Sequence, residues 1–194
     1  MSLTFETLRD AQIGHALDDL ARLRTEVFRA WPYLYDGDPA NETHYLRSYE
    51  KAEGAILVAA KDGERIVGCA TGMPLARHED ASDVPLDELG LTMGQVFYCA
   101  ESVLLPAWRG QGAGHAFFDR RETHARDLGF DVSMFCAVER PDDHPLKPKD
   151  ARPLGPFWEK RGYTARDAHV TMTWRDVNED APTEKRLRVW TKPL

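Results

Sequence analysis

Three glycines at alternate positions, Gly110, Gly112 and Gly114, are the residues best suited to build a binding site. They follow an apolar run from Val96 to Leu105 and precede a helix-like run from Ala113 to Leu128. Glycine lets backbone N–H groups approach a ligand closely, and the first turn of a helix leaves its N–H donors unpaired. A strand, a glycine turn and a helix N-terminus therefore predict a site for an anion such as a pyrophosphate.

Two other nucleotide-binding motifs fit this stretch less well. A P-loop continues from its glycines into Gly-Lys-Ser or Gly-Lys-Thr, whereas His115 follows Gly114 here. A dinucleotide-binding fingerprint reads Gly-x-Gly-x-x-Gly and has an acidic residue about 20 positions later. The alternate spacing supplies neither pattern. An NAD-binding protein stays an alternative, which protection by NAD against unfolding would reveal.

The residues around the glycines resemble a family signature. Residues 101–114 read Glu-Ser-Val-Leu-Leu-Pro-Ala-Trp-Arg-Gly-Gln-Gly-Ala-Gly. This run is similar to the acetyl-coenzyme A (acetyl-CoA) signature of the GCN5-related N-acetyltransferases (GNAT). A second stretch, Phe157 to Tyr163, looks like the helix and aromatic turn after the family's fifth strand. The two matches cover residues 96–175 well, and upstream the resemblance lies only in the order of the elements.

This resemblance implies a fold, a donor and an activity. The fold is an α/β mixed sheet, mostly antiparallel, with a splay between its fourth and fifth strands and helices on both faces, in a single domain over residues 1–194. The activity is that of an acetyl-CoA-dependent N-acyltransferase that moves an acetyl group to a primary amine. The expected contacts to acetyl-CoA are Val103, Leu104, Leu105, Arg109, Gly110, Gln111, Gly112, Ala113, Gly114 and His115.

Acetyl transfer to an amine needs an acceptor for the amine's proton and a proton for the departing thiolate. Glu101 is the candidate base, because it is the one acidic group in an apolar strand and burial there would raise its pKa. A carboxylate that faces water or is ion-paired is the alternative. The family's usual acid is a tyrosine at the position that Trp158 holds here, so Tyr98 is the candidate acid. A thiol with a pKa of about 8.5 can also leave with water as its proton source.

The resemblance places the amine acceptor between two walls. Trp31, Tyr33, Tyr35 and Asp36 fall where the family's first two helices border the substrate. Residues at the end of the fifth strand, Glu139, Asp142, Asp143 and His144, are expected to form the opposite wall, and Trp158 is a further expected contact of the acceptor. Aromatic faces and carboxylates together suit a cationic amine. The alternative is that the tyrosines are core residues and the acids are solvated.

Composition narrows the class of partner. The 194 residues have a net charge of −7 and a pI near 5.5, whereas a nucleic-acid-binding protein needs a basic surface. An acidic surface favours a cationic small molecule as the substrate. No segment approaches the ~20 apolar residues that span a bilayer, and residues 1–6 have no basic or apolar signal region. No membrane partner and a cytoplasmic location are therefore expected.

Cysteine and histidine spacing predicts neither a disulfide nor a metal site. The three cysteines lie in separate apolar runs without Cys-x-x-Cys spacing, which is typical of buried, reduced thiols. These are Cys69, Cys99 and Cys136. The histidines at 115, 124 and 144 are too scattered for a metal ligand set.

The hydrophobic pattern predicts the elements that carry these residues. Strands are expected at 4–8, 55–61, 65–73, 96–105, 130–138 and 169–174, and helices at 13–31, around 45–49, at 113–128 and at 157–161. Asp62-Gly63 predicts a hairpin turn between the second and third strands. Residues 77–94 are expected to form an irregular insert with one helical turn, and residues 140–156, with five prolines, a long irregular loop.

Residues 176–194 are predicted to be a polar C-terminal tail. Its apolar residues Val189 and Trp190 are expected to dock onto the body of the protein or onto a partner, because the family often forms dimers. Two other functions stay open beside small-molecule acetylation. One is a sensor that binds acyl-CoA without catalysis, and the other is an acetyltransferase for protein N-termini or lysines.

Overall fold

The strands of this protein form one mixed sheet, and the computed structural model describes residues 3–194, apart from the side chains of residues 39–41, 43, 44 and 80. The strands are β1 (Thr4–Arg9), β2 (Ile56–Asp62), β3 (Arg65–Pro74), β4 (Val96–Tyr98), β5 (Ser102–Leu104), β6 (Val132–Val138), β7 (Thr164–Trp174) and β8 (Thr183–Pro193). Their order is β1-β2-β3-β4-β6-β8-β7, with β5 paired to β3. Within the described sheet, the β4–β6 pair is parallel and the others are antiparallel, which confirms the expected fold class.

Five α-helices are described, joined by short 3-10 turns. They are α1 (Leu17–Phe28), α2 (Pro39–Lys51), α3 (Leu86–Leu89), α4 (Ala113–Asp127) and α5 (Gly155–Lys160). The 3-10 turns are η1 (Asp10–Ala16), η2 (Leu75–Arg77), η3 (Glu79–Asp83), η4 (Met93–Gln95) and η5 (Pro106–Trp108). The single helix expected over residues 13–31 is thus divided, because η1 precedes α1 and the α-helix ends at Phe28.

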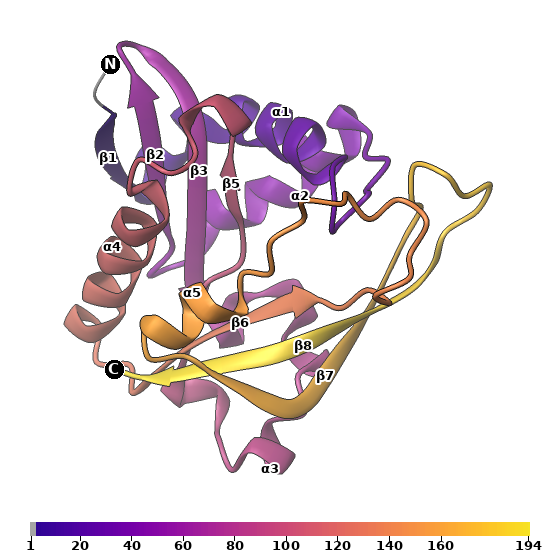
Figure 1. The fold of residues 1–194 in the computed structure, drawn as a ribbon. Helices are drawn as coiled ribbons and strands as arrows, with labels where there is room; N and C mark the ends of the chain where they lie inside the picture. Colours follow the sequence, from indigo (N-terminus) through magenta and orange to yellow (C-terminus); the bar gives the residue numbers. More distant parts are fainter. Residues whose placement is uncertain (1–2) are drawn as a thin grey trace.

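Strand β2 shows how the sequence places helices on both faces of the sheet. Successive side chains of a strand point to opposite faces. Leu57 and Ala59 pack in the core cluster that contains α1 and α2, whereas Ile56, Val58 and Ala60 pack in the cluster that contains α4. Figure 1 shows α1 and α2 on one side of β2 and β3 and α4 on the other. An uninterrupted apolar strand therefore contributes side chains to a hydrophobic core on each face of the sheet.

The predicted hairpin is confirmed, with β2 and β3 paired antiparallel through Asp62↔Arg65. Gly63 in its turn has a φ of +60°, a conformation that glycine adopts readily. The insert before β4 consists of α3 and 3-10 turns, as expected. Its buried residues Leu75, Val84 and Leu89 pack in a third core cluster with β6, β7 and β8.

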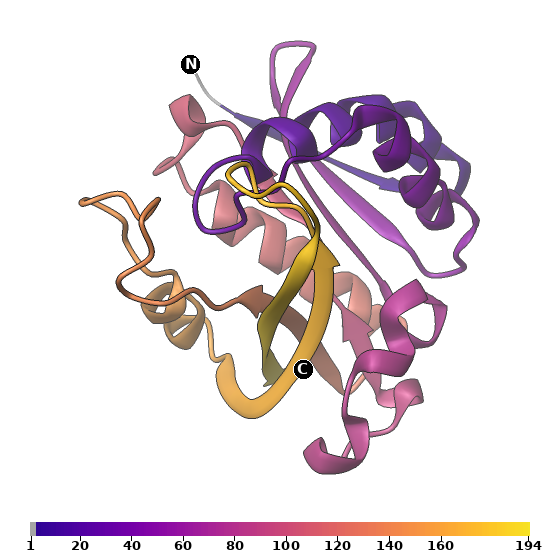
Figure 2. The same cartoon turned by 90° about the vertical axis from the view of Figure 1, so that its right-hand side faces the viewer.

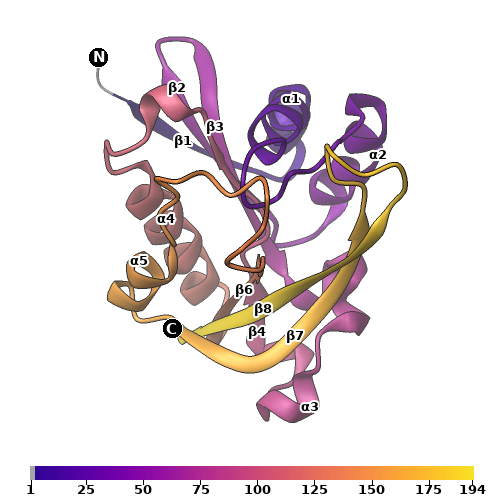
Figure 3. The same ribbon diagram turned by 45° about the vertical axis from the view of Figure 1, so that its right-hand side comes forward.

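The C-terminal segment is not a tail. Strand β8 lies between β6 and β7 and pairs with both along most of its length. Val189 is 0% exposed and Trp190 is 7% exposed, so both are buried in their own chain and not available to a partner. Charged residues alternate with these apolar ones, which is the pattern of a strand and not of a polar tail. Figure 3 shows β6, β8 and β7 running across the lower half of the molecule.

Candidate active site

The sheet opens at a break in its fourth strand. Strand β4 pairs with β6, and the bond from Cys99 N–H to the Met134 carbonyl (2.7 Å) continues that pairing by one residue. After residues 99–101 the chain continues as β5, which pairs with β3 alone among the described strands. This confirms the splay, and it leaves one edge of β5 unpaired beside β6.

Arg121 on α4 holds the break in place from within the core. Its side chain is 0% exposed. Its Nη1 donates to the carbonyls of Thr71 and Glu101, both at 3.0 Å, and its Nη2 donates to the Ser102 hydroxyl at 3.0 Å. A strand that leaves its ladder exposes backbone carbonyls, and a buried carbonyl without a partner is destabilising. The guanidinium supplies those partners.

The unpaired edge of β5 presents the backbone of Ser102 and Leu104. Leu105 N–H donates to the Val67 carbonyl at 3.0 Å, and Thr71 N–H donates to the Glu101 carbonyl at 3.1 Å. Backbone groups alternate between the two edges of an antiparallel strand, so residues 101, 103 and 105 bond β3. The expectation for Val103 and Leu105 is therefore corrected: their backbone groups serve β3 and their side chains lie in the core.

A cavity of about 540 Å³ lies between this edge, the glycine turn and α5. We call it the glycine-turn cavity. Most of its wall is apolar, and it includes Leu104, Arg109, Gly110, Gly112, Ala113, Gly114, His115, Phe118, Phe135, Phe157 and Trp158. Gln111 is absent from this wall, because its side chain folds back to the Ala107 carbonyl (3.5 Å). A role for the Gln111 side chain in the cavity is therefore not supported.

The glycine turn has the geometry of an open cradle. Gly110 and Gly112 have φ values of +76° and +84°, in the left-handed region that favours glycine. A methyl group at either position would meet no protein atom within 4 Å, so the space beside the turn is free. Gly112 is the N-cap of α4, whose first N–H groups have no intrahelical acceptor. Gly114 has a packing role as well, because a Cβ there would lie 3.2 Å from the Phe157 ring.

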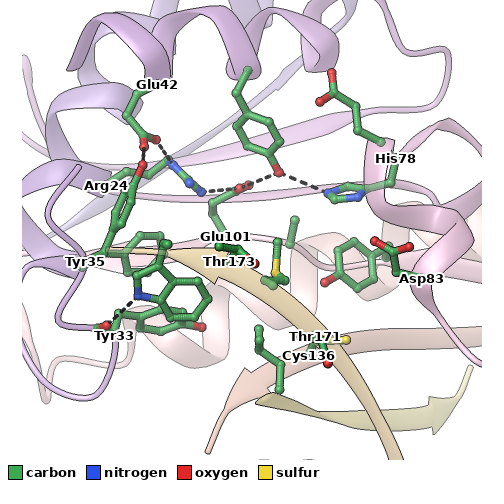
Figure 4. Close-up of a pocket in the computed structure, with 18 residues that line it drawn as sticks. Arg24, Tyr33, Tyr35, Glu42, His78, Asp83, Glu101, Cys136, Thr171 and Thr173 are labelled. Carbon is green, nitrogen blue, oxygen red and sulfur yellow. Dashed lines mark hydrogen bonds and ion pairs between the residues drawn. The ribbon is translucent and has the colours of Figure 1, made fainter. Parts of the chain in front are cut away.

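A second cavity, of about 590 Å³, lies on the other side of the break. We call it the tyrosine cavity. Its wall includes Arg24, Tyr33, Tyr35, Glu42, Tyr45, His78, Glu79, Asp83, Tyr98, Glu101, Thr171 and Trp174 (Figure 4). Phe28, Tyr33, Ala100 and Cys136 line both cavities. The two cavities therefore meet at the break in the fourth strand.

One half-buried arginine joins two buried carboxylates in the tyrosine cavity. The Arg24 Nη1 donates to Glu101 at 2.5 Å, and its Nε donates to Glu42. The Tyr35 hydroxyl donates to Glu42 at 2.6 Å. The Thr71 hydroxyl donates to the Glu101 carboxylate and accepts from the Glu101 N–H at 3.1 Å. Charges this deep in a protein must be paired, and here one cation serves two anions.

The structure corrects the expected ionisation of Glu101. Burial by itself would raise the pKa of this carboxyl, but the Arg24 guanidinium, the Thr71 hydroxyl and His78 outweigh it and hold the pKa below its ordinary value of 4.5. The expectation of a pKa raised towards neutrality was wrong, because the sequence did not show which cation faces Glu101. At neutral pH Glu101 is therefore an anion and a weak proton acceptor.

Tyr98 lies in the tyrosine cavity, with its ring 4.7 Å from the His78 ring. Burial raises the pKa of the Tyr98 hydroxyl well above its ordinary value of 10. Proton transfer from such a phenol to a thiolate, whose conjugate acid has a pKa of about 8.5, is uphill. The structure therefore does not favour Tyr98 as the acid. Burial also raises the pKa of Tyr33 to about 12, so this hydroxyl stays protonated at neutral pH.

Of six residues expected to contact the acceptor, three line a cavity and three do not. Tyr33 and Tyr35 line the tyrosine cavity, whereas Trp158 lies in the glycine-turn cavity and packs against Phe135 and Trp190. The other three line neither cavity, because each has a different partner. Trp31 packs against His144, Asp36 is ion-paired with Arg29 and Arg175, and Asp142 is ion-paired with Lys147.

Sequence reasoning missed Arg24, Glu42 and His78. A signal for Arg24 was present, because it continues the helical spacing of Ile13, Leu17 and Leu20, where an apolar residue is expected. A charge inside a buried stripe indicates a buried partner. Nothing comparable marks Glu42 or His78, which reach the cavity from α2 and from the insert after β3.

The two cavities together form the candidate active site. Among the described residues, no group of three or more metal-ligating side chains is placed to hold an ion. None of the described helices is long and apolar enough to cross a membrane. The three cysteines are buried and reduced, as expected.

Solved structures share the fold over the whole chain. A ribosomal-protein-alanine N-acetyltransferase from Brucella melitensis has a TM-score of 0.63 at 12% identity, covering 98% of this chain and 99% of its own. YncA from Salmonella typhimurium, solved with acetyl-CoA, has a TM-score of 0.59 at 12% identity, covering 100% and 95%. The PaiA N-acetyltransferase of Thermoplasma acidophilum, solved with coenzyme A, has a TM-score of 0.56 at 11% identity, covering 100% of both chains. At these identities the likeness concerns the fold.

The splayed sheet and its glycine turn thus define an acyl-CoA N-acyltransferase fold. Residues 18–147, more than half of the chain, match the family model of the acetyltransferase (GNAT) family. The chain belongs to this family. A comparison with curated protein sequences finds no match.

Proposed function

We propose that this protein transfers an acetyl group from acetyl-CoA to a primary amine of a small cationic molecule, by direct attack of the amine on the thioester. The observation that carries this proposal is the meeting of two cavities at the break in the fourth strand, where Ala100 and Cys136 line both. A donor in one cavity and an acceptor in the other would place their reacting groups at that junction. Family membership supports the acetyl transfer itself.

The glycine-turn cavity suits acetyl-CoA in two respects. Gly110 and Gly112 leave an open cradle at the N-terminus of α4, where free N–H groups and the helix dipole attract phosphate. Arg109 lies on the same wall and offers further donors. Behind the turn, the apolar wall and the unpaired edge of β5 fit a long amide chain, since the Ser102 backbone and the Leu104 N–H can bond its peptide-like groups. The Leu104 carbonyl already accepts from Arg109 Nε at 3.3 Å.

Acetyl-CoA would supply the acetyl thioester, whose carbonyl carbon gains a bond to nitrogen as its bond to sulfur breaks. An ammonium acceptor gives up two protons in all, of which one ends on the thiol and one goes to solvent. The protein's own part is to hold both ligands in line, to exclude water and to carry the protons. The backbone edge of β5 and the shared wall at Tyr33 and Ala100 would position the reacting carbonyl.

The acceptor follows from the charge and shape of the tyrosine cavity. Its wall carries four carboxylates, those of Glu42, Glu79, Asp83 and Glu101, against the cation of Arg24. Aromatic rings make up much of the remaining wall, and aromatic faces attract ammonium groups. An excess of negative charge would attract a cationic amine, and a cavity of about 590 Å³ would take a small one.

The first experiment compares thermal unfolding with acetyl-CoA, coenzyme A and NAD in the wild type, Gly112→Ala and Gly129→Ala. Gly112 and Gly129 have nearly equal φ values, +84° and +82°, and an added methyl meets no atom within 4 Å at either. We expect each variant to lose about 1 kcal/mol of stability from backbone strain. Only Gly112→Ala should also lose protection by the coenzyme A ligands, because only Gly112 borders the cradle. Protection by NAD, or equal protection of both variants, would contradict the donor site.

The second measurement follows thiol release from acetyl-CoA with a panel of amines. The panel contains small diamines, amino acids, neutral amines and peptides with a free N-terminus. The proposal expects release with cationic small amines at kcat/KM values well above those for neutral ones. Release with peptides alone would favour a protein acetyltransferase. Donor binding without release for any amine would favour a sensor.

A further inference from the structure

Four side chains border the passage between the two cavities. Phe28, Tyr33, Ala100 and Cys136 line both the glycine-turn cavity and the tyrosine cavity. Two of them are aromatic and two are small, and none is a carboxylate, an amine or a guanidinium. The acyl group of the donor would lie in this passage, because the thioester must reach an amine held on the other side. The passage therefore suits a small apolar acyl group.

One side of the passage consists of two packed rings, Phe28 and Tyr33, which we call the aromatic pair. Phe28 is the last residue of α1, and Tyr33 follows in the loop after that helix. Their ring centroids are 4.4 Å apart, which is a close aromatic contact. The Arg24 guanidinium lies 5.2 Å from the centroid of the Phe28 ring. Each ring of the pair thus has a neighbour that limits its movement.

The chain holds Tyr33 through its backbone as well as its ring. The Tyr33 carbonyl accepts from Arg140 Nη2 at 2.6 Å and from Trp174 Nε1 at 3.1 Å, and the Tyr33 ring lies 6.1 Å from the Trp174 ring. Leu34, the next residue, is buried and has a φ of +56°. A residue other than glycine adopts this conformation only where the surrounding structure fixes it. The position of Tyr33 is therefore set by contacts that do not involve its hydroxyl.

The other side of the passage forms where the sheet opens. Ala100 follows Cys99, whose N–H makes the last bond to β6, and Cys136 lies on β6 itself. Strand β6 is also paired with β8, so its backbone is fixed on that edge. Figure 4 shows Tyr33 and Cys136 on the wall of the tyrosine cavity, away from Glu42. Short side chains on this side leave the aromatic pair as the large groups that an acyl chain would meet.

We propose that Tyr33 and Phe28 limit the length of the acyl group, so that acetyl is preferred over longer acyl groups. This inference rests on the proposed function. An acetyl group carries one methyl beyond its carbonyl, whereas propionyl and butyryl add one and two carbons. Each added carbon must displace a held ring or take space that the amine needs. Packed side chains resist added methylene groups, so the aromatic pair determines specificity without taking part in proton transfer.

The test measures kcat/KM for acetyl-CoA, propionyl-CoA and butyryl-CoA with the best amine of the panel at saturation. In the wild type we expect each added methylene to lower kcat/KM by about tenfold or more. Tyr33→Leu removes the ring but keeps an apolar side chain, so the ratio of acetyl-CoA to butyryl-CoA should fall to about 10 or less. Ala100→Val narrows the passage from the opposite side and should raise this ratio. Tyr33→Phe keeps the ring and should keep the wild-type ratio.

The matched control is Phe130→Leu. Phe130 is half-buried like Tyr33, packs with its ring 5.7 Å from Phe97, and lines neither cavity. Loss of this ring should leave the ratio of acetyl-CoA to butyryl-CoA within about twofold of the wild-type value. Thermal unfolding shows which variants are folded, and Ala100→Val carries the test if Tyr33→Leu is not.

Two results would overturn the length limit while leaving acyl transfer intact. One is a wild type that uses butyryl-CoA as well as acetyl-CoA. The other is an unchanged ratio in folded Tyr33→Leu, or in folded Ala100→Val. A wild type that releases no thiol with any amine would instead overturn the proposed function, and the length limit with it.

Discussion

At the scale of single residues, the tyrosine cavity depends on a half-buried charge that pairs with two buried carboxylates. Arg24 occupies a position in α1 where the helical spacing calls for an apolar side chain. Its guanidinium lies between Glu42 and Glu101 and pairs with both. Removing one partner from such a group leaves an uncompensated buried charge, which typically destabilises by about 3 to 5 kcal/mol. The three residues therefore act together to fix the wall of the tyrosine cavity.

Glu101→Gln should change how stability depends on pH. The folded-state pKa of Glu101 is below its ordinary value of 4.5. A depressed carboxyl pKa contributes stability above the unfolded pKa, and this contribution is lost as pH falls through the folded pKa. We expect the wild type to be more stable than Glu101→Gln at pH 7 and the difference to shrink below about pH 4.5. Urea midpoints at pH 7, 5 and 3.5 measure this difference, and a constant gap would show that Glu101 does not titrate with a lowered pKa.

At the scale of elements, the splay is an interrupted strand that a helix keeps open. Strands β4 and β5 form one apolar run in the sequence, yet β4 pairs with β6 and β5 with β3. Arg121 on α4 donates to the carbonyls that the interruption exposes. The same helix begins at the glycine turn. One element thus begins at the glycine turn and holds the gap beside it.

Arg121→Met should therefore destabilise the fold and weaken donor binding. The change leaves the Thr71 carbonyl without this donor in the core, at about 1 to 3 kcal/mol for an unsatisfied group, while the Glu101 carbonyl keeps its bond from the Thr71 N–H. We expect a loss of about 1 to 3 kcal/mol in the free energy of unfolding in urea. Arg126→Met is the control on the same helix, because the Arg126 side chain is 47% exposed. This variant should lose less than about 0.5 kcal/mol of folding free energy. Equal losses in the two variants would contradict this role of Arg121.

At the scale of the whole molecule, the C-terminal hairpin closes the tyrosine cavity. Asp176, in the turn between β7 and β8, forms two bonds with Arg140 at 2.6 and 2.9 Å. Arg140 also donates to the carbonyls of Pro32 and Tyr33, and Tyr35 bridges to Asp176. Figure 2 shows this hairpin turn beside the loop after α1. Segments more than 100 residues apart in the sequence are thereby held as one wall.

Arg140→Lys should impair acceptor binding more than donor binding. Lysine cannot bond Asp176 through two nitrogens and serve two carbonyls at the same time. We expect the KM for the amine to rise about tenfold, equivalent to about 1.4 kcal/mol, while the KM for acetyl-CoA stays within about twofold. Arg186→Lys on β8 is the control, since its side chain is 64% exposed. Steady-state kinetics with each substrate varied in turn decide the matter, and an equal rise in both KM values would contradict a local effect on the acceptor wall.

The sequence by itself determined most of the elements and the glycine turn. Period-two and helical spacing are local properties, so the β2–β3 hairpin, the helix after the glycine turn and strand β6 could be predicted. The open turn at the start of α4 could also be predicted, because left-handed glycines and a free helix N-terminus follow from local sequence. The anion that this turn would bind stays a prediction. Strand β8 was missed, since its alternating charges resemble a polar tail when its pairing with β6 and β7 is not known.

Only the tertiary structure decided the composition of the tyrosine cavity. Arg24, Glu42, Glu101 and His78 come from four separate segments, and nothing in the sequence states which of them meet. The ionisation of Glu101 depends on Arg24, a residue 77 positions away, so its pKa moved in the direction opposite to that expected from burial. Likewise, Asp36 and Asp142 are ion-paired with Arg29 and Lys147 and do not line the cavities. Local order follows from neighbouring residues, whereas the charge of a buried group follows from what packs against it.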